Sequence, residues 1–198
     1  MSTSDVIDEC SPLPSDVTGI DADHPAAFDE HRRYLESTVV STIAGALGER
    51  RAWRSERLWP WWRFRHDQDG GTAWHEASHA VLAEGVFFVH RVSIVAGKLG
   101  NRPYSGIMVS STSPDPASVE LPTRVITDRR TIAKSCMKLG RDWRGGVREY
   151  HRLHLQAVML LDANWPLVRA VARALSERRE LNREEFLCVL ESSRPTTS

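Results

Sequence analysis

The chain has 198 residues, of which 41% are hydrophobic and 26% charged, and its formal net charge at pH 7 is zero. This composition is typical of a globular domain with a sizeable core. No run of eighteen apolar residues occurs and the N-terminus lacks a basic and then apolar signal pattern, so we expect a cytoplasmic protein without a transmembrane segment. The cysteines Cys10, Cys136 and Cys188 lie far apart without CxxC spacing, which argues against a disulfide framework and a thiolate zinc site.

The charge is unevenly distributed along the chain. Residues 1–24 contain six acidic residues and no Lys or Arg, together with Ser, Thr and Pro, so we predict a disordered acidic tail over residues 1–25. We assign residues 26–191 to a single domain that begins with a helix over residues 26–47, in which Gly45 and Gly48 weaken the C-terminal end. The polar residues 192–198 are expected to form a frayed tail.

Residues 50–66 are rich in both arginine and tryptophan, with the sequence RRAWRSERLWPWWRFRH. Such a segment can bind nucleic acid, a membrane surface or an acidic partner, because guanidinium groups contact phosphates and indoles stack on bases. The alternative, which we favour, is a helix and turn broken at Pro60, with the tryptophans packed on the core and the arginines solvated. A further hypothesis is that the acidic tail covers this segment.

The most informative stretch is residues 72–84, TAWHEASHAVLAE, which contains the pattern HExxH. In a helix, His75 and His79 lie one above the other and can bind one Zn²⁺. Glu76 then lies within reach of a water activated by the metal and can act as its general base. The alternative is a buried helix whose histidines are hydrogen-bonded core residues.

The surroundings of this pattern favour a buried helix with defined ends. Thr72 is a suitable N-cap after two glycines, and Gly85 is a suitable C-terminal stop. A face of small apolar residues can bury the helix while both histidines lie on another face. The residues of this face are Ala73, Ala77, Ala80 and Val81.

The segments after this helix predict a small β-hairpin and then several helices. Residues 86–96 and 107–110 predict two strands joined by a turn-rich connection, followed by a loop over residues 111–122. An open strand edge here can pair with an extended peptide and lay it across the metal. Helices are expected over residues 125–139, 143–162 and 166–175, the last capped by Asn164, and then over a short segment that opens with a capping box of Asn182 and Glu185.

The stretch TAWHEASHAVLAEGVFFVHRVSIVAG, followed by GIMVSS, resembles the start of the peptidase domain of FtsH-like zinc metalloproteases. That family has HEAGHA on a helix, then a VSI-type strand and a short hairpin. The C-terminal NWPLVRAVARALSERRELNREEF is similar to the closing helices of small FtsH-like proteins. The resemblance implies a mainly helical α+β domain of the zincin-like, FtsH-peptidase-like type, with a small hairpin after the HExxH helix.

This sequence departs from the family in three ways. The usual small-residue helix between the hairpin and the third ligand is not recognisable in residues 111–124. Ser78 stands where the family usually has Gly, which adds a hydroxyl beside the metal helix. No Walker A motif is present, so the resemblance implies a separate ATPase or an oligomeric partner. A metzincin is excluded because Leu82 and Gly85 occupy its Gly and third His positions, whereas a regulatory HExxH protease that cleaves repressors stays open.

The family draws its third metal ligand from an Asp at the head of a downstream helix. Asp128, in VITDRRTIAKSC, matches that position, and a carboxylate there leaves the fourth coordination site open for water. The alternative is that Asp128 only caps its helix. Rival ligands also come from this half of the chain, with His151 and His154 expected on a solvated polar face. The rivals are Glu120, Asp142, Glu149, His151 and His154.

The sequence therefore predicts a zinc-dependent metalloendopeptidase that acts on polypeptide substrates. His75, His79 and Asp128 are the predicted Zn²⁺ ligands, and Glu76 is the predicted general base that passes the proton to the leaving amine. The alternative function is a non-catalytic, FtsH-peptidase-like binding or regulatory protein, which engages a partner or nucleic acid through residues 50–66.

Overall fold

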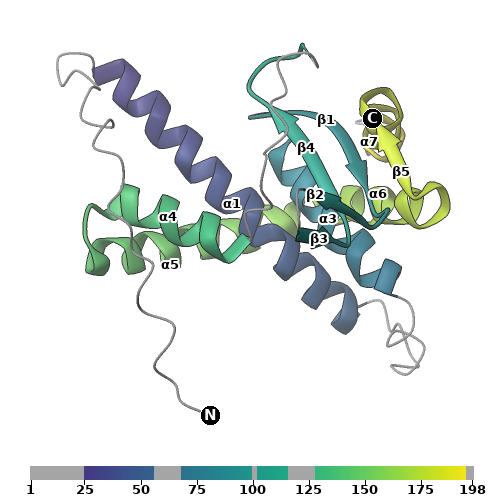
Figure 1. Ribbon diagram of the computed structural model, residues 1–198, viewed down its shortest axis with the longest axis horizontal. Helices are drawn as coiled ribbons and strands as arrows, with labels where there is room; N and C mark the ends of the chain where they lie inside the picture. Colours follow the sequence, from purple (N-terminus) through teal and green to yellow (C-terminus); the bar gives the residue numbers. More distant parts are fainter. Residues whose placement is uncertain (1–24, 56–67, 100–101, 116–127, 195–198) are drawn as a thin grey trace. The chain divides into compact units, whose positions relative to one another are not determined.

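Figure 1 shows a computed structural model of the chain, which describes residues 25–55, 68–99, 102–115 and 128–194. The chain divides into two compact units, Met1–Arg33 and Tyr34–Ser198. The structure describes only the start of a helix in the first unit, so the sites discussed below belong to the second. Most of the predicted acidic tail and of the Arg/Trp segment lies outside the described residues.

The described part of the chain is mainly helical with a small antiparallel sheet, which confirms the expected class. The helices are α1 (Pro25–Ser55), α3 (Gln68–Ala83), α4 (Asp128–Gly140), α5 (Trp143–Ala163), α6 (Trp165–Arg178) and α7 (Arg183–Ser193). The strands are β1 (Phe88–Ser93), β2 (Gly97–Leu99), β3 (Arg102–Tyr104), β4 (Ile107–Ser111) and β5 (Glu180–Asn182).

Strand β1 lies at the centre of a three-stranded antiparallel sheet with the order β4-β1-β5. Val92 of β1 is opposite Met108 of β4 on one side and Leu181 of β5 on the other. The register against β4 shifts between Val89 and Arg91, and this bulge lets Val89 and Val92 both be buried although they are three residues apart. The two expected strands are therefore observed. Strand β5 is an additional strand, and the expected turn-rich connection contains two more, β2 and β3, which pair with each other.

Two groups of buried side chains form the core of the second unit. The larger surrounds α3, whose buried residues pack with β1, α6 and α7, and all four members of its expected apolar face are buried. The smaller joins α1 to α4 and α5, with Val39, Leu139 and Leu153 among its members. In Figure 1, α4 and α5 run side by side, whereas α3 and α6 lie with the sheet. The helix that carries HExxH is thus anchored by close packing.

Several helix ends differ from the sequence expectation. Helix α1 continues through Gly45 and Gly48 to Ser55, and α3 begins at Gln68, so Thr72 lies inside the helix and is not its N-cap. Helix α3 ends before Gly85, which has a positive φ of 99°, as expected of a stop. Packing of the long helices against the core outweighs the low helix propensity of these glycines.

The start of the last helix agrees with the prediction from the sequence, whereas the start of α6 does so only in part. Asn182 and Glu185 form the expected capping box at the start of α7. Asn164 lies between α5 and α6, but its side chain donates to the Leu160 carbonyl oxygen at 2.8 Å and does not cap α6. Among the described cysteines, Cys136 is buried and Cys188 exposed, and both are free thiols.

A stack of three side chains connects helices that are far apart in the sequence. The rings of Trp74 on α3 and Trp165 on α6 are nearly parallel, with centroids 5.2 Å apart. The guanidinium carbon of Arg51 on α1 lies 4.5 Å from the Trp165 ring centroid, which is a cation–π contact. This stack fixes the start of the HExxH turn relative to α1 and α6.

Candidate metal centre

Helix α3 presents two imidazoles side by side. The rings of His75 and His79 have centroids 4.6 Å apart and are inclined by 80°, as four-residue spacing on a helix allows. Asp128, the first residue of α4, brings its Oδ2 atom to 3.1 Å from Nε2 of His75 and 3.5 Å from Nε2 of His79. Within the described ranges, these three residues are the only group of His, Cys, Asp and Glu side chains that can hold a metal ion.

The separations of these three donors suit a tetrahedral ion. Ligand bonds of about 2.0–2.1 Å at a tetrahedral angle place neighbouring donor atoms about 3.3 Å apart. The two distances from Asp128 to the imidazole nitrogens, 3.1 and 3.5 Å, lie on either side of this value, and the three donor atoms all lie within 4.8 Å of one another. Asp128 is the first residue of α4, and its carboxylate faces the two histidines.

The second nitrogen of each imidazole faces helix α1. Nδ1 of His79 lies 2.7 Å from the backbone carbonyl oxygen of Ser41 and must donate to it, because a carbonyl oxygen only accepts. Nδ1 of His75 lies 3.5 Å from Oε2 of Glu49. Such partners hold an imidazole in the tautomer that leaves Nε2 free to bind a metal. Helix α1 therefore orients both histidines.

Two glycines allow α1 to approach the HExxH helix closely. A Cβ atom on Gly45 would lie 2.8 Å from Nε2 of His75 and closer still to Nε2 of His79. A Cβ atom on Gly48 would lie 2.6 Å from Cβ of Ser78 and closer to its hydroxyl. The glycines that the sequence suggested as helix-weakening are thus contact positions, and Gly45 leaves the space in front of both Nε2 atoms clear.

The hydroxyl of Ser78 does not face the three donor atoms. It donates to the backbone carbonyl oxygen of Trp74 at 2.7 Å, and the residue is fully buried against α1 at Gly48. The serine that replaces the glycine of FtsH-like sequences is therefore accommodated by a glycine on the neighbouring helix.

Glu76 lies beside the donor cluster and is only 7% exposed. On its other side is Gly106, directly before β4, where a Cβ atom would lie 2.8 Å from Oε1 of Glu76 and 2.6 Å from Cγ2 of Thr72. The absence of a side chain at Gly106 therefore gives the carboxyl group its place between the three donors and the start of the edge strand.

The acid and base groups of the cluster influence one another strongly when no metal is bound. Burial raises the pKa of Glu76, and the imidazoles of His79 and His75 offset only part of this effect. Burial alone would lower the pKa of His79, but Asp128, Glu76 and the Ser41 carbonyl raise it overall. Burial likewise acts to raise the pKa of Asp128, yet hydrogen bonds from both histidines hold it well below its usual value.

The rival ligands do not join this cluster in the described structure. Asp142 caps α5 through a 2.6 Å hydrogen bond from the Gly145 amide, and Glu149 accepts from Arg152 at 2.8 Å. His151 is exposed, as expected. The expectation of a solvated face is wrong for His154, whose Nδ1 atom is buried, and Glu120 lies outside the described residues.

Sequence reasoning did not find the contribution of α1 to this site. Ser41, Gly45 and Glu49 follow one another at four-residue intervals and so share one face of the helix. A small residue placed four positions from a serine and four from a glutamate is common in helices, so by itself it only weakly indicates a contact with a metal-binding helix. It becomes informative only once a second helix with HExxH is known to cross at that point.

Comparisons with known proteins add no relative to this description. No family model matches the sequence, and comparisons with curated proteins and with solved structures find no match. None of the described helices has the length and apolar composition needed to cross a lipid bilayer. The likeness to FtsH-like proteins therefore stays a resemblance of motifs, and a function has to be argued from the site itself.

Proposed function

We propose that the protein is a zinc-dependent metallopeptidase with a zincin-like, FtsH-peptidase-like domain. The observation that carries this proposal is the convergence of Nε2 of His75, Nε2 of His79 and Oδ2 of Asp128 beside the buried carboxyl group of Glu76. Two hydrogen-bonded histidines in a core would need neither a shared carboxylate oxygen nor an adjacent buried glutamate. The arrangement is one that hydrolytic metal sites require.

Zinc is the metal that suits these residues best. Two imidazole nitrogens and one carboxylate oxygen are a common catalytic donor set for Zn²⁺, and three protein ligands leave a fourth position for water or substrate. When bound, the ion would polarise a water molecule and the carbonyl group of the peptide bond. The Ser41 carbonyl and Glu49 would keep the two Nε2 atoms directed at it.

Glu76 is the residue that would move the proton. As a carboxylate it would accept a proton from the attacking water, and as a carboxylic acid it would return that proton to the amine nitrogen as the peptide bond breaks. Its burial limits exchange of that proton with bulk water. His75, His79 and Asp128 would hold their positions throughout.

An extended polypeptide is the substrate class that the surroundings favour. Strand β4 is at the edge of the sheet among the described strands, and it begins next to Gly106 and Glu76. A peptide that paired with this edge would reach the cluster with its backbone, as in other cases of strand addition. A cavity of about 340 Å³ between α1 and β4 adjoins this edge and could take substrate side chains. It is lined in part by Thr38, Ser41, Met108 and Ser110.

The partner that delivers substrate is part of the same proposal. Residues 1–198 contain no Walker A motif, so an ATPase that unfolds a stable substrate would have to lie outside them, for example in a separate or oligomeric partner. The protein alone would then cleave only peptides and unfolded chains.

Hydrolysis by purified protein loaded with zinc tests this function. We expect the protein to cleave an unfolded protein such as reduced casein, with the appearance of new amino termini as the measured signal. Removal of the metal by a chelator should abolish this cleavage. Glu76→Gln should retain zinc and lower the rate about 10²- to 10⁴-fold, because the proton acceptor is removed. Zinc binding without hydrolysis by the wild type would instead support a non-catalytic binding or regulatory protein.

A further inference from the structure

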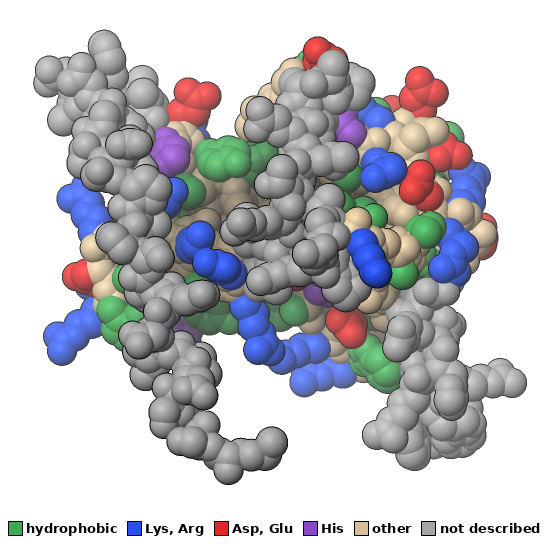
Figure 2. Space-filling model, viewed as in Figure 1, with side chains coloured by type: hydrophobic (Ala, Val, Ile, Leu, Met, Phe, Trp, Pro, Cys, Tyr) green, Lys and Arg blue, Asp and Glu red, His purple; other side chains and the backbone are tan. Residues whose placement is uncertain are grey.

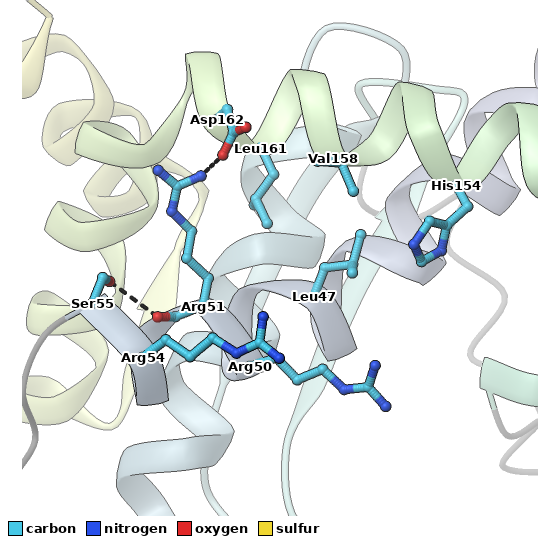
Figure 3. Close-up of a pocket in the computed structure, with 9 residues that line it drawn as sticks. All are labelled: Leu47, Arg50, Arg51, Arg54, Ser55, His154, Val158, Leu161 and Asp162. Carbon is cyan, nitrogen blue, oxygen red and sulfur yellow. Dashed lines mark hydrogen bonds and ion pairs between the residues drawn. The ribbon is translucent and has the colours of Figure 1, made fainter.

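A second cavity, of about 530 Å³, lies between α1 and α5 (Figure 3). On α1 it is lined by Leu47 and by residues 50, 51, 54 and 55, and on α5 by His154 and by residues 158, 161 and 162. The α1 positions repeat at three- and four-residue intervals and so form one stripe along the helix. Ser41, Gly45 and Glu49, which contact the histidines, belong to another face. The cavity is therefore separate from the candidate metal centre.

The arginines of this cavity have two different roles. Arg51 forms an ion pair with Asp162 across one end, as Figure 3 shows, and stacks on Trp165. Arg50 and Arg54 are exposed, and neither makes an ion pair or hydrogen bond through its side chain within the described ranges. The first guanidinium is thus part of the cavity wall, and the other two are available to a ligand.

His154 lines the cavity at one end. Its Nδ1 atom is buried and is the one buried side-chain polar atom without a hydrogen-bond partner in the described residues. A buried polar atom without a partner is costly, and native structures usually satisfy it with protein, water or ligand. In Figure 3 the imidazole projects from α5 at the end of the cavity opposite the Arg51–Asp162 pair. The polar groups therefore lie at the ends and rim of the cavity.

Apolar side chains lie between these polar groups. Leu47 extends from α1 toward α5, where Val158 and Leu161 face it across the cavity (Figure 3). The volume falls in the range of about 300–1,000 Å³ that is usual for sites of small organic ligands. On the face drawn in Figure 2, acidic and basic side chains are interspersed, so neither sign of charge dominates the described part of that face.

We propose that this cavity binds a small organic anion with an apolar body and one phosphate or carboxylate group. The anionic group would accept hydrogen bonds from the exposed guanidinium groups of Arg50 and Arg54. The apolar body would cover Leu47, Val158 and Leu161. This binding needs neither the metal nor hydrolysis, so it can fail or succeed independently of the proposed peptidase function.

Isothermal titration calorimetry with octyl phosphate, octanoate, inorganic phosphate and octanol tests this proposal on the full chain, with each amphiphile kept below its micelle concentration. We expect saturable binding of at least one octyl anion, and binding of inorganic phosphate and octanol that is at least about tenfold weaker. The better of the two octyl anions identifies the head group. The proposal is overturned if no probe binds, or if inorganic phosphate binds as tightly as octyl phosphate.

Variants of the cavity locate the binding. Arg50→Gln/Arg54→Gln should weaken it about tenfold or more, because this double variant removes both charges that would bind the anionic group. Arg144→Gln/Arg148→Gln removes the same charge from exposed positions of α5 outside the cavity and should leave the affinity unchanged. Equal weakening by both double variants, with thermal unfolding unchanged, would show non-specific charge attraction and overturn the site.

Discussion

A Cβ atom on Gly45 would lie 2.8 Å from Nε2 of His75, although the two residues are on different helices. The glycine therefore leaves clear the space next to the Nε2 atoms of both histidines. Its neighbours on the same face, Ser41 and Glu49, contact the opposite nitrogens of the two rings. One face of α1 thus both orients the imidazoles and leaves room for what they bind.

Gly45→Ala tests this arrangement. Replacing Gly by Ala inside a helix usually stabilises it by about 0.5–1 kcal/mol, whereas here the methyl group would occupy the space before both Nε2 atoms. We expect zinc content to fall to near zero while the protein still folds. Ala46→Ser is the control on the same helix, because it adds one heavy atom at an exposed position. Full zinc content in Gly45→Ala would contradict this role.

Glu49→Ala tests the orientation of His75. The carboxylate faces Nδ1 of that ring at 3.5 Å, and loss of such a partner typically lowers metal affinity about 10- to 100-fold. Competition with a zinc-binding dye would measure the change. Glu191→Ala, at an exposed position on α7, removes the same charge and should have no effect. Equal affinities of the two variants would exclude the proposed contribution of Glu49.

The pH dependence of zinc binding follows from the raised pKa of His79. When no metal is bound, the folded protein holds a proton on this imidazole at a higher pH than usual, and zinc can bind only after that proton leaves. Affinity should therefore fall as the pH decreases through the raised pKa of His79. Calorimetry in two buffers of different ionisation enthalpy would count the released protons. Zinc affinity that does not change between pH 6 and 8 would contradict this coupling.

The contact between Ser78 and Gly48 predicts a compensating pair of substitutions. Gly48→Ala should destabilise the protein by about 1–3 kcal/mol, because its Cβ atom would overlap the Ser78 side chain. Adding Ser78→Gly should recover much of this loss, so that the two effects are not additive. Urea unfolding of the wild type, both single variants and the double variant measures the coupling. Additive effects would show that the two side chains do not limit the approach of α1 to α3.

Much of this fold follows from local patterns in the sequence. The HExxH helix, the strands on either side of the turn-rich connection and the capping box of Asn182 and Glu185 all depend on short-range spacing, which a sequence displays directly. The start of α3 was predicted wrongly, because Thr72 after two glycines has the form of an N-cap. The helix continues upstream to Gln68, where tertiary structure overrides propensity.

Features that depend on contacts between distant segments could not be predicted in this way. Strand β5 has three residues and is a strand only because it pairs with β1. The contacts of Ser41 and Glu49 require α1 to cross the HExxH helix, and nothing local in residues 41–49 indicates that crossing. The buried Nδ1 atom of His154 was missed for the same reason, since its environment comes from α1.

Zinc content per chain, measured by elemental analysis of protein purified without chelator, tests the central claim most directly. We expect about one zinc in the wild type and loss of that zinc in both His79→Ala and Asp128→Ala, because each removes one of three ligands. Retention of the zinc by Asp128→Ala would mean that another residue completes the site. A wild type that contains no zinc and takes up none when it is added would contradict the metallopeptidase account.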